Sequence, residues 1–166
     1  LELENSRLRS LAGENRSLRG QLGLPGYQGL TLQPAEVLAL TGEPHAASAT
    51  LSAGAEHGVR FGDAVVTSDG LVGRIGEVYR SHSRVVLLTD QNAAVACEVE
   101  STGVLGVLRF APSPHPRLVL TLVPFADTVY VGQRILTSGL SRRDPRGIPG
   151  GRVVRLGTAE GGLTQE

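Results

Sequence analysis

The sequence predicts a mainly β protein in which an N-terminal coiled-coil helix is followed by two small β-barrel-like subdomains. Leucines recur at coiled-coil spacing within the first part of the chain. From Glu36 onward, short apolar runs alternate with Gly, Pro, Asp and Asn, which is typical of short strands joined by tight turns. No later segment keeps a helical period, and no βαβ alternation is present, so small barrels or a sandwich are favoured over an α/β fold.

The N-terminal helix is predicted from a narrow apolar stripe. Leu8 and Leu22 share one heptad position with Asn15 between them, and Leu11 and Leu18 fall on the other position of the seam. We therefore predict these five residues as dimerisation contacts. An Asn at a buried seam position fixes the register and favours two parallel strands. The alternative is a single amphipathic helix that packs on its own domain.

The domain boundaries follow from the breaks in these patterns. The helix should end near Gly23, because glycines cluster there and Pro25 cannot continue the helical hydrogen bonds. The polar, glycine-containing C-terminus has the composition of a disordered tail. We predict a coiled-coil helix at 1–24, a linker with the first strand at 25–46, a β-barrel subdomain at 47–110, a second one at 111–157 that exchanges strands with the first, and a disordered tail at 158–166.

Ten segments have the residue types of strands, being rich in leucine and β-branched residues. They are 36–41, 48–51, 64–67, 71–79, 84–88, 94–99, 103–110, 118–123, 134–137 and 152–156. A weak internal repeat relates residues 59–68 to residues 129–138, and each copy is followed by Gly, Arg and an aliphatic residue at 73–75 and 151–153. Duplication and convergence on a common turn both account for this repeat.

Three stretches carry motifs with a defined order. The first, at 62–74, contains Gly62, Asp63, Gly70, Leu71, Gly73 and Arg74; the second, at 83–90, ends in Asp90; the third, at 131–153, contains Gly132, Ser138, Gly139, Pro149 and Gly151. In type, order and spacing these stretches resemble the MreC family of rod shape-determining proteins. The chain departs from that pattern at Gln91, where the family often has Pro, and at Gln133, where an acidic residue is usual.

The resemblance implies a non-enzymatic scaffold of the cell-wall elongation machinery that controls rod cell shape. Such a protein would associate with itself as a dimer or filament, would contact the penicillin-binding transpeptidase of elongation and MreD, and would be linked through them to MreB. The resemblance also implies a single-pass protein of the inner membrane. The chain begins at Leu1 without Met, and the resemblance implies a membrane helix upstream of it, with this fragment on the periplasmic side. It also implies structural roles for the motif residues named above.

The residues themselves do not predict an enzyme. Histidines, aspartates and serines occur, but neither Gly-x-Ser-x-Gly nor Gly-Asp-Ser-Gly is present, so a trypsin-like serine hydrolase is disfavoured. The histidines lack the spacing of a metal site, and the glycines lack that of a phosphate loop, so no cofactor or metal is expected. A membrane-fusion adaptor of a transport system also joins a coiled coil to β-rich domains, but it would need a second helical arm.

The charge balance limits the classes of binding partner that the sequence predicts. The 16 basic and 16 acidic residues balance, which gives no electrostatic reason to expect nucleic acid as a partner. Arg142, Arg143 and Arg146 form one basic cluster, which we interpret as a solvated loop that could alternatively contact an acidic partner. Cys97 lies in an apolar run and is expected to be a buried thiol.

Overall fold

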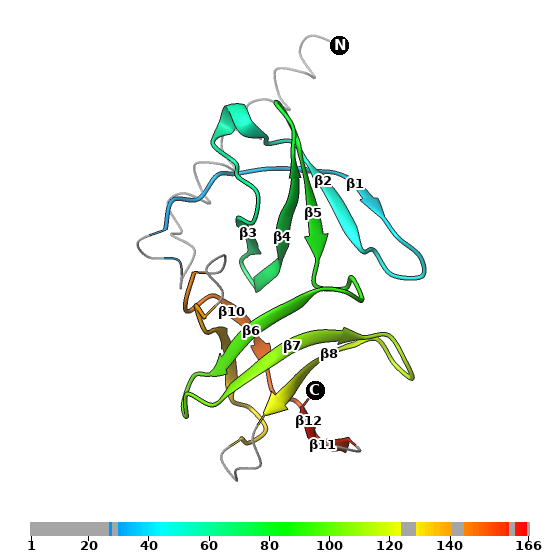
Figure 1. Cartoon of the computed structure of the whole chain (residues 1–166), viewed down its shortest axis with the longest axis vertical. Helices are drawn as coiled ribbons and strands as arrows, with labels where there is room; N and C mark the ends of the chain where they lie inside the picture. The colour runs from blue at the N-terminus through cyan, green and yellow to red at the C-terminus, as the bar shows by residue number, and fades with distance from the viewer. Residues whose placement is uncertain (1–26, 28–29, 124–128, 141–144, 160–161, 166) are drawn as a thin grey trace, which may run out of the picture.

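The computed structural model describes residues 27, 30–123, 129–140, 145–159 and 162–165. Figure 1 shows two β-sheets placed one above the other along the long axis of the molecule. The predicted coiled-coil helix and its five seam residues lie outside the described residues. Within the described residues, no helix is long and apolar enough to cross a membrane.

The first sheet is antiparallel and has the strand order β1-β2-β5-β4-β3. Its strands are β1 (Val37–Thr41), β2 (Ser48–Leu51), β3 (Ala64–Thr67), β4 (Gly70–Val78) and β5 (Ser83–Leu87), with a short 3-10 helix at Ala55–His57. Buried and accessible residues alternate along β2 and β5, as expected for strands with one face on a core. A small core of Ala49, Leu51, Ile75 and Val85 results.

The second sheet forms a half-barrel with the order β10-β9-β6-β7-β8-β12-β11. Its strands are β6 (Ala94–Val99), β7 (Leu105–Ala111), β8 (Arg117–Val123), β9 (Arg134–Thr137), β10 (Pro149–Arg152), β11 (Leu156–Ala159) and β12 (Gly162–Gln165). The larger core lies here, with Cys97, Val99, Leu120, Ile135 and Ile148 among its buried members.

The two sheets share the larger core. Leu71 from β4, Leu88 just after β5 and Tyr27 all pack into the same cluster as Ile148 and Val153. The apolar surface at the meeting of the sheets is therefore removed from water, which stabilises their relative position.

Most of the predicted strands are present, within two residues of the expected bounds. Three expectations differ from the structure. The strands predicted at 94–99 and 103–110, which we assigned to the first subdomain, form β6 and β7 of the second sheet, so the change of sheet falls between β5 and β6. The strand predicted at 152–156 is replaced by β10 and β11, on either side of it. The tail predicted as disordered contributes the end of β11 and the whole of β12, which pairs with β8.

Candidate functional site at the joint between the two sheets

Two of the three sequence motifs meet where β4 contacts β10, at a place we call the joint. Gly70, at the start of β4, has a φ of +136°, and a Cβ built on it would lie 2.3 Å from the carbonyl oxygen of Pro149. Both the backbone conformation and the space therefore require glycine. Leu71 follows directly and is buried in the shared core. The first and third motifs thus fix the position of one sheet on the other.

The second motif forms the connection between the sheets. The carboxylate of Asp90 accepts a hydrogen bond from the backbone N–H of Asn92 at 2.7 Å, and the Asp90 N–H donates to the Leu87 carbonyl. This is the local turn that an Asp side chain favours. Gln91, the departure from the family pattern, lies within this turn and leaves its hydrogen bonds intact.

Tyr27 fastens the chain before the first sheet to the joint. Its hydroxyl donates a hydrogen bond of 2.9 Å to the carbonyl of Thr67, and its ring is buried in the shared core. Burial, assisted by the nearby negative charge of Asp69, raises the pKa of the Tyr27 phenol, so the hydroxyl stays a donor at physiological pH. The sequence analysis assigned no role to this residue.

Two turns repeat the same geometry at equivalent places. In the first sheet, Asp63 accepts from the N–H of Arg60 at 2.8 Å, while Gly62 and Asp63 exchange backbone hydrogen bonds with Ile75. In the second, Gln133 accepts from the N–H of Tyr130 at 2.7 Å, while Gly132 and Gln133 exchange backbone hydrogen bonds with Val153. Both glycines have positive φ, +87° and +94°. The internal repeat is therefore present in three dimensions.

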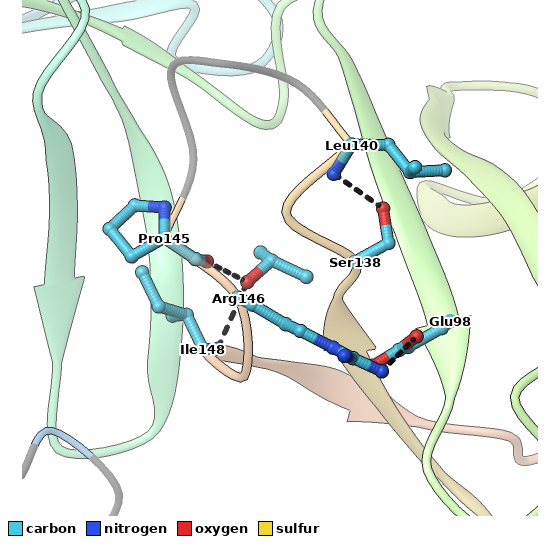
Figure 2. Close-up of polar contacts among 7 residues, drawn as sticks. Glu98, Ser138, Leu140, Pro145, Arg146 and Ile148 are labelled. Carbon is cyan, nitrogen blue, oxygen red and sulfur yellow. Dashed lines mark hydrogen bonds and ion pairs between the residues drawn. The ribbon is translucent and has the colours of Figure 1, made fainter.

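The loop between β9 and β10 is held by a buried hydroxyl. Thr137 is fully buried; its hydroxyl donates to the carbonyl of Pro145 and accepts from the N–H of Ile148 at 2.9 Å (Figure 2). Ser138 accepts a hydrogen bond from the N–H of Leu140 at 3.4 Å. The Thr-Ser-Gly motif thus closes the loop, and its Thr carries more of the hydrogen bonding than its Ser.

Arg146 ties the same loop to β6. Its guanidinium makes two contacts with the carboxylate of Glu98, at 2.9 and 3.1 Å (Figure 2). These hydrogen bonds raise the pKa of Arg146. We predicted a solvated basic loop here; the Arg146 side chain is indeed 72% exposed, and it also has an acidic partner within the chain. Arg142 and Arg143 lie outside the described residues.

The remaining motif residues shape strands and turns. Gly73 lies on β4, where a Cβ would lie 2.3 Å from the carbonyl oxygen of Val86 on β5. The positive charge of Arg74 lowers the pKa of the Cys97 thiol in the larger core, against the stronger raising effect of burial. Gly139 has a φ of +71° in the loop after β9, and Gly151 has a φ of +145° in β10. None of these residues suggests a catalytic role.

The side chains considered for hydrolysis do not gather at one place. Nδ1 of His57 accepts from the N–H of Gly54, His82 stacks on Tyr79, and His45 lies edge-on to Phe110. Ser138 is engaged with Leu140. Among the described residues, no group of three potential metal ligands occurs.

Among the described residues, two of the apolar surfaces outside the joint are a groove and an exposed strand. A groove of about 280 Å³ opens between β8 and β10; its walls are mainly aliphatic, with one arginine on each side. The lining residues used below are Leu108, Leu118, Val154, Arg117 and Arg152. The second surface is β1, all five residues of which are exposed.

Comparison with known proteins places this fold in a family. The model of the family described as "Rod shape-determining protein MreC, barrel core" matches residues 37–166. The chain belongs to the MreC family. It is 32% identical over 156 residues to the cell shape-determining protein MreC of Caulobacter vibrioides, covering 93% of this chain and 44% of the relative. It is 42% identical over 103 residues to that of Cereibacter sphaeroides, covering 62% of this chain and 34% of the relative.

Solved structures agree with this assignment. A structure of MreC superposes with a TM-score of 0.79 at 25% identity, covering 94% of this chain and 90% of that one. MreC from Pseudomonas aeruginosa superposes with a TM-score of 0.70 at 26% identity, covering 79% and 86%. MreC from Helicobacter pylori, solved in a complex with penicillin-binding protein PBP2, shares the fold with a TM-score of 0.66 at 17% identity, covering 81% and 84%. The chain spans less than half the length of the two curated MreC relatives described above.

Proposed function

We propose that this chain is the extracytoplasmic barrel part of a cell shape-determining protein and that it acts as a scaffold without catalysing a reaction. The observation that carries the proposal is the family match over residues 37–166. The geometry supports it, because the motif residues lock two sheets together at the joint and none of them assembles a reactive site. A rigid body with exposed apolar surfaces is suited to positioning other proteins.

The partner that we propose first is the penicillin-binding transpeptidase of elongation. The support is the Helicobacter pylori complex, in which an MreC protein of the same fold is bound to PBP2. We further propose self-association through the predicted coiled coil, contact with MreD, and an indirect link to MreB. We also propose that the chain lies outside the cytoplasmic membrane, as part of a single-pass protein of that membrane.

We propose the groove between β8 and β10 as the docking site for the transpeptidase. Its aliphatic walls suit a large apolar side chain. The positive charges of Arg117 and Arg152, which already donate to backbone carbonyls of this chain, favour a carboxylate next to that side chain. An apolar anchor in a pocket surrounded by polar groups is the usual arrangement of a binding hot spot. The occupant would therefore be a segment of the transpeptidase with an apolar residue next to Asp or Glu.

Binding of the purified extracytoplasmic part of the transpeptidase to this chain tests the proposal. Biolayer interferometry should show binding to the parent chain and a loss of about tenfold or more for Val154→Glu, because the new carboxylate stands at the mouth of the groove. Leu105→Glu is the matched control, because Leu105 is also an exposed apolar residue but does not line the groove.

Two results would contradict different parts of the proposal. If the parent chain does not bind the transpeptidase, the partner is wrong. If the parent binds and both variants bind equally well, the scaffold function stands and the groove is not the docking site. Growth of rod-shaped cells that depend on the Val154→Glu variant would then be expected to remain normal.

A further inference from the structure

Strand β1 is an apolar strand with an open edge. Val37, Leu38 and Leu40 are 60%, 59% and 64% exposed, and Figure 1 shows β1 at one side of the upper sheet, away from the joint. β1 ends the strand order of the first sheet, so among the described residues only β2 pairs with it. Its outer backbone groups are therefore available to an added strand.

The outer backbone groups of β1 include those of Leu40. The carbonyl of Thr41 accepts a hydrogen bond from the N–H of Ala47, on the inner side of the strand. Successive residues direct their N–H and C=O groups to opposite sides of a strand. The N–H and C=O of Leu40 therefore point to the open edge. β1 itself contains no charged residue and no proline, which are common protections of such an edge.

The two ends of β1 carry negative charge. Glu36 directly precedes the strand, Glu43 follows it after Gly42, and both glutamates are exposed. Elsewhere among the described residues, each glutamate has an arginine as its ion-pair partner: Glu56 with Arg80, Glu77 with Arg84, Glu98 with Arg146 and Glu100 with Arg134. Within the same part of the chain, the carboxylates at the ends of β1 form no such pair. They are therefore suited to a cation from outside the chain.

The negative end at Glu43 continues into a pocket. This pocket, of about 230 Å³, lies beside the turn between β1 and β2, and its lining includes Glu43, His45, Asp90 and Phe110. The described residues that line it include no lysine or arginine. Two carboxylates near an aromatic ring suit a long basic side chain, whose alkyl stem can lie on the ring while its charge meets the carboxylates.

We propose that β1 accepts an extended segment of a different protein as an added strand, and that this segment has apolar residues between a Lys or Arg at each end. The backbone of β1 supplies the hydrogen bonds, and the two glutamates select the charge. The inference goes beyond the proposed function, because it names a second docking surface, separate from the groove between β8 and β10, and a second kind of partner.

The same charges disfavour a second copy of this chain as the occupant. Antiparallel pairing of two β1 strands would bring Glu36 of each copy toward Glu43 of the other, and like charges opposite each other are destabilising. A segment with basic ends gains an opposite-charge contact at each glutamate. The charges thus act in both directions, by attracting the basic segment and by repelling the identical strand.

Binding of synthetic peptides to the full 166-residue chain tests the proposal. The probe is a fluorescein-labelled peptide as long as residues 36–43, with a lysine at each end and alternating valine and threonine between them. Fluorescence anisotropy should show that it binds, and that the same peptide with glutamates at its ends binds about tenfold more weakly. A lysine-ended peptide with two adjacent prolines at its centre should not bind, because proline removes an N–H from each edge.

Charge reversal locates the binding site on the chain. Glu36→Lys with Glu43→Lys should reverse the preference, to about tenfold in favour of the glutamate-ended peptide. Glu56→Lys is the matched control, because Glu56 is an exposed glutamate on the 3-10 helix, and it should keep the preference of the parent. Circular dichroism checks that each variant is folded. The milder pair Glu36→Gln with Glu43→Gln should abolish the preference, and it replaces the reversal if that variant does not fold.

Hydrogen exchange measured by NMR reports on the strand itself. The N–H of Leu40 points to the open edge and should exchange rapidly in the free chain. A saturating amount of the lysine-ended peptide should slow this exchange by about tenfold, because the N–H then donates to the added strand. The glutamate-ended peptide at the same concentration should slow it less.

Four results would overturn the proposal. They are equal binding of the lysine-ended and glutamate-ended peptides, binding of the proline peptide, an unchanged preference after charge reversal, and an unchanged exchange rate at Leu40. Protection of the Leu40 N–H without peptide, rising with protein concentration, would also overturn it and assign β1 to a second copy. If the peptides fail to bind while the parent chain still binds the transpeptidase, the β1 inference is wrong and the proposed function stands.

Discussion

Asp63 and Gln133 make equivalent hydrogen bonds in the two sheets. Each side chain accepts from the backbone N–H three residues earlier, at 2.8 Å from Arg60 and at 2.7 Å from Tyr130. The backbone carbonyl of each residue also accepts a hydrogen bond from the residue that directly follows a Gly-Arg pair, Ile75 in the first sheet and Val153 in the second. Gln133 thus fulfils with an amide oxygen the role that Asp63 fulfils with a carboxylate.

The first prediction follows from this equivalence. Asp63→Ala and Gln133→Ala should each lower the free energy of unfolding by about 1 kcal/mol, because each leaves a turn N–H without its side-chain acceptor. Urea denaturation measures both. Gln133 also donates to Ser101, so Ser101→Ala serves as a control for that second bond. If only one of the two alanine variants is destabilised, the turns are not energetically equivalent.

The strands could be predicted from the sequence, and the way they combine could not. Alternation and turn residues mark 48–51, 64–67, 94–99 and 134–137 because these signals are local. β6 pairs with β7 and with β9, and nothing in residues 94–99 indicates which sheet they join. The same holds for β12, whose glycine and polar residues resemble a disordered tail until they pair with β8.

In the candidate site as well, the local features could be predicted from the sequence and the long-range contacts could not. Most of the motif glycines are visible in the sequence because a local turn or bend requires positive φ at their positions. The contact of Gly70 with Pro149 and the pair Glu98–Arg146 join residues far apart in the sequence. A single sequence carries no signal for such contacts, so the motifs were recognised as structural without the joint being foreseen.

The second prediction concerns the joint. Gly70→Ala should lower the free energy of unfolding by about 2–5 kcal/mol, because the new Cβ would collide with the Pro149 carbonyl and the positive φ would be strained. Gly58→Ala is the matched control, since Gly58 has a φ of +84° but no atom within 4 Å of a built Cβ. It should lose about 1 kcal/mol. If urea denaturation gave equal losses of unfolding free energy for the two variants, the sheets would be able to move apart around the new Cβ without a further loss of stability.

The third prediction concerns Thr137. Thr137→Val keeps the shape of the side chain but removes the hydroxyl, leaving the Ile148 N–H and the Pro145 carbonyl without this partner. We expect a loss of about 2–4 kcal/mol in the free energy of unfolding. Thr137→Ser retains the hydroxyl and should lose about 1 kcal/mol, the contribution of one buried methyl group. A valine variant as stable as the serine variant would contradict the role of the hydroxyl.

The fourth prediction concerns the thiol of Cys97, which is fully buried on β6. Burial raises the pKa of this thiol from 9.0 to about 12, against a smaller opposing effect of Arg74. The native thiol should therefore resist a thiolate-specific reagent such as DTNB at pH 8 and react at once in urea.

The raised pKa of Cys97 also makes stability depend on pH. In the unfolded chain the thiol ionises near pH 9, whereas in the folded chain it stays protonated. Stability is thus unaffected below pH 9 and falls as the pH rises toward 12. Cys97→Ala should lack this decline, so the stability of the parent relative to the variant should decrease above pH 9 in urea titrations. Rapid labelling of the native protein at pH 8, or parallel pH profiles for the two proteins, would show that the core of the second sheet is open to solvent.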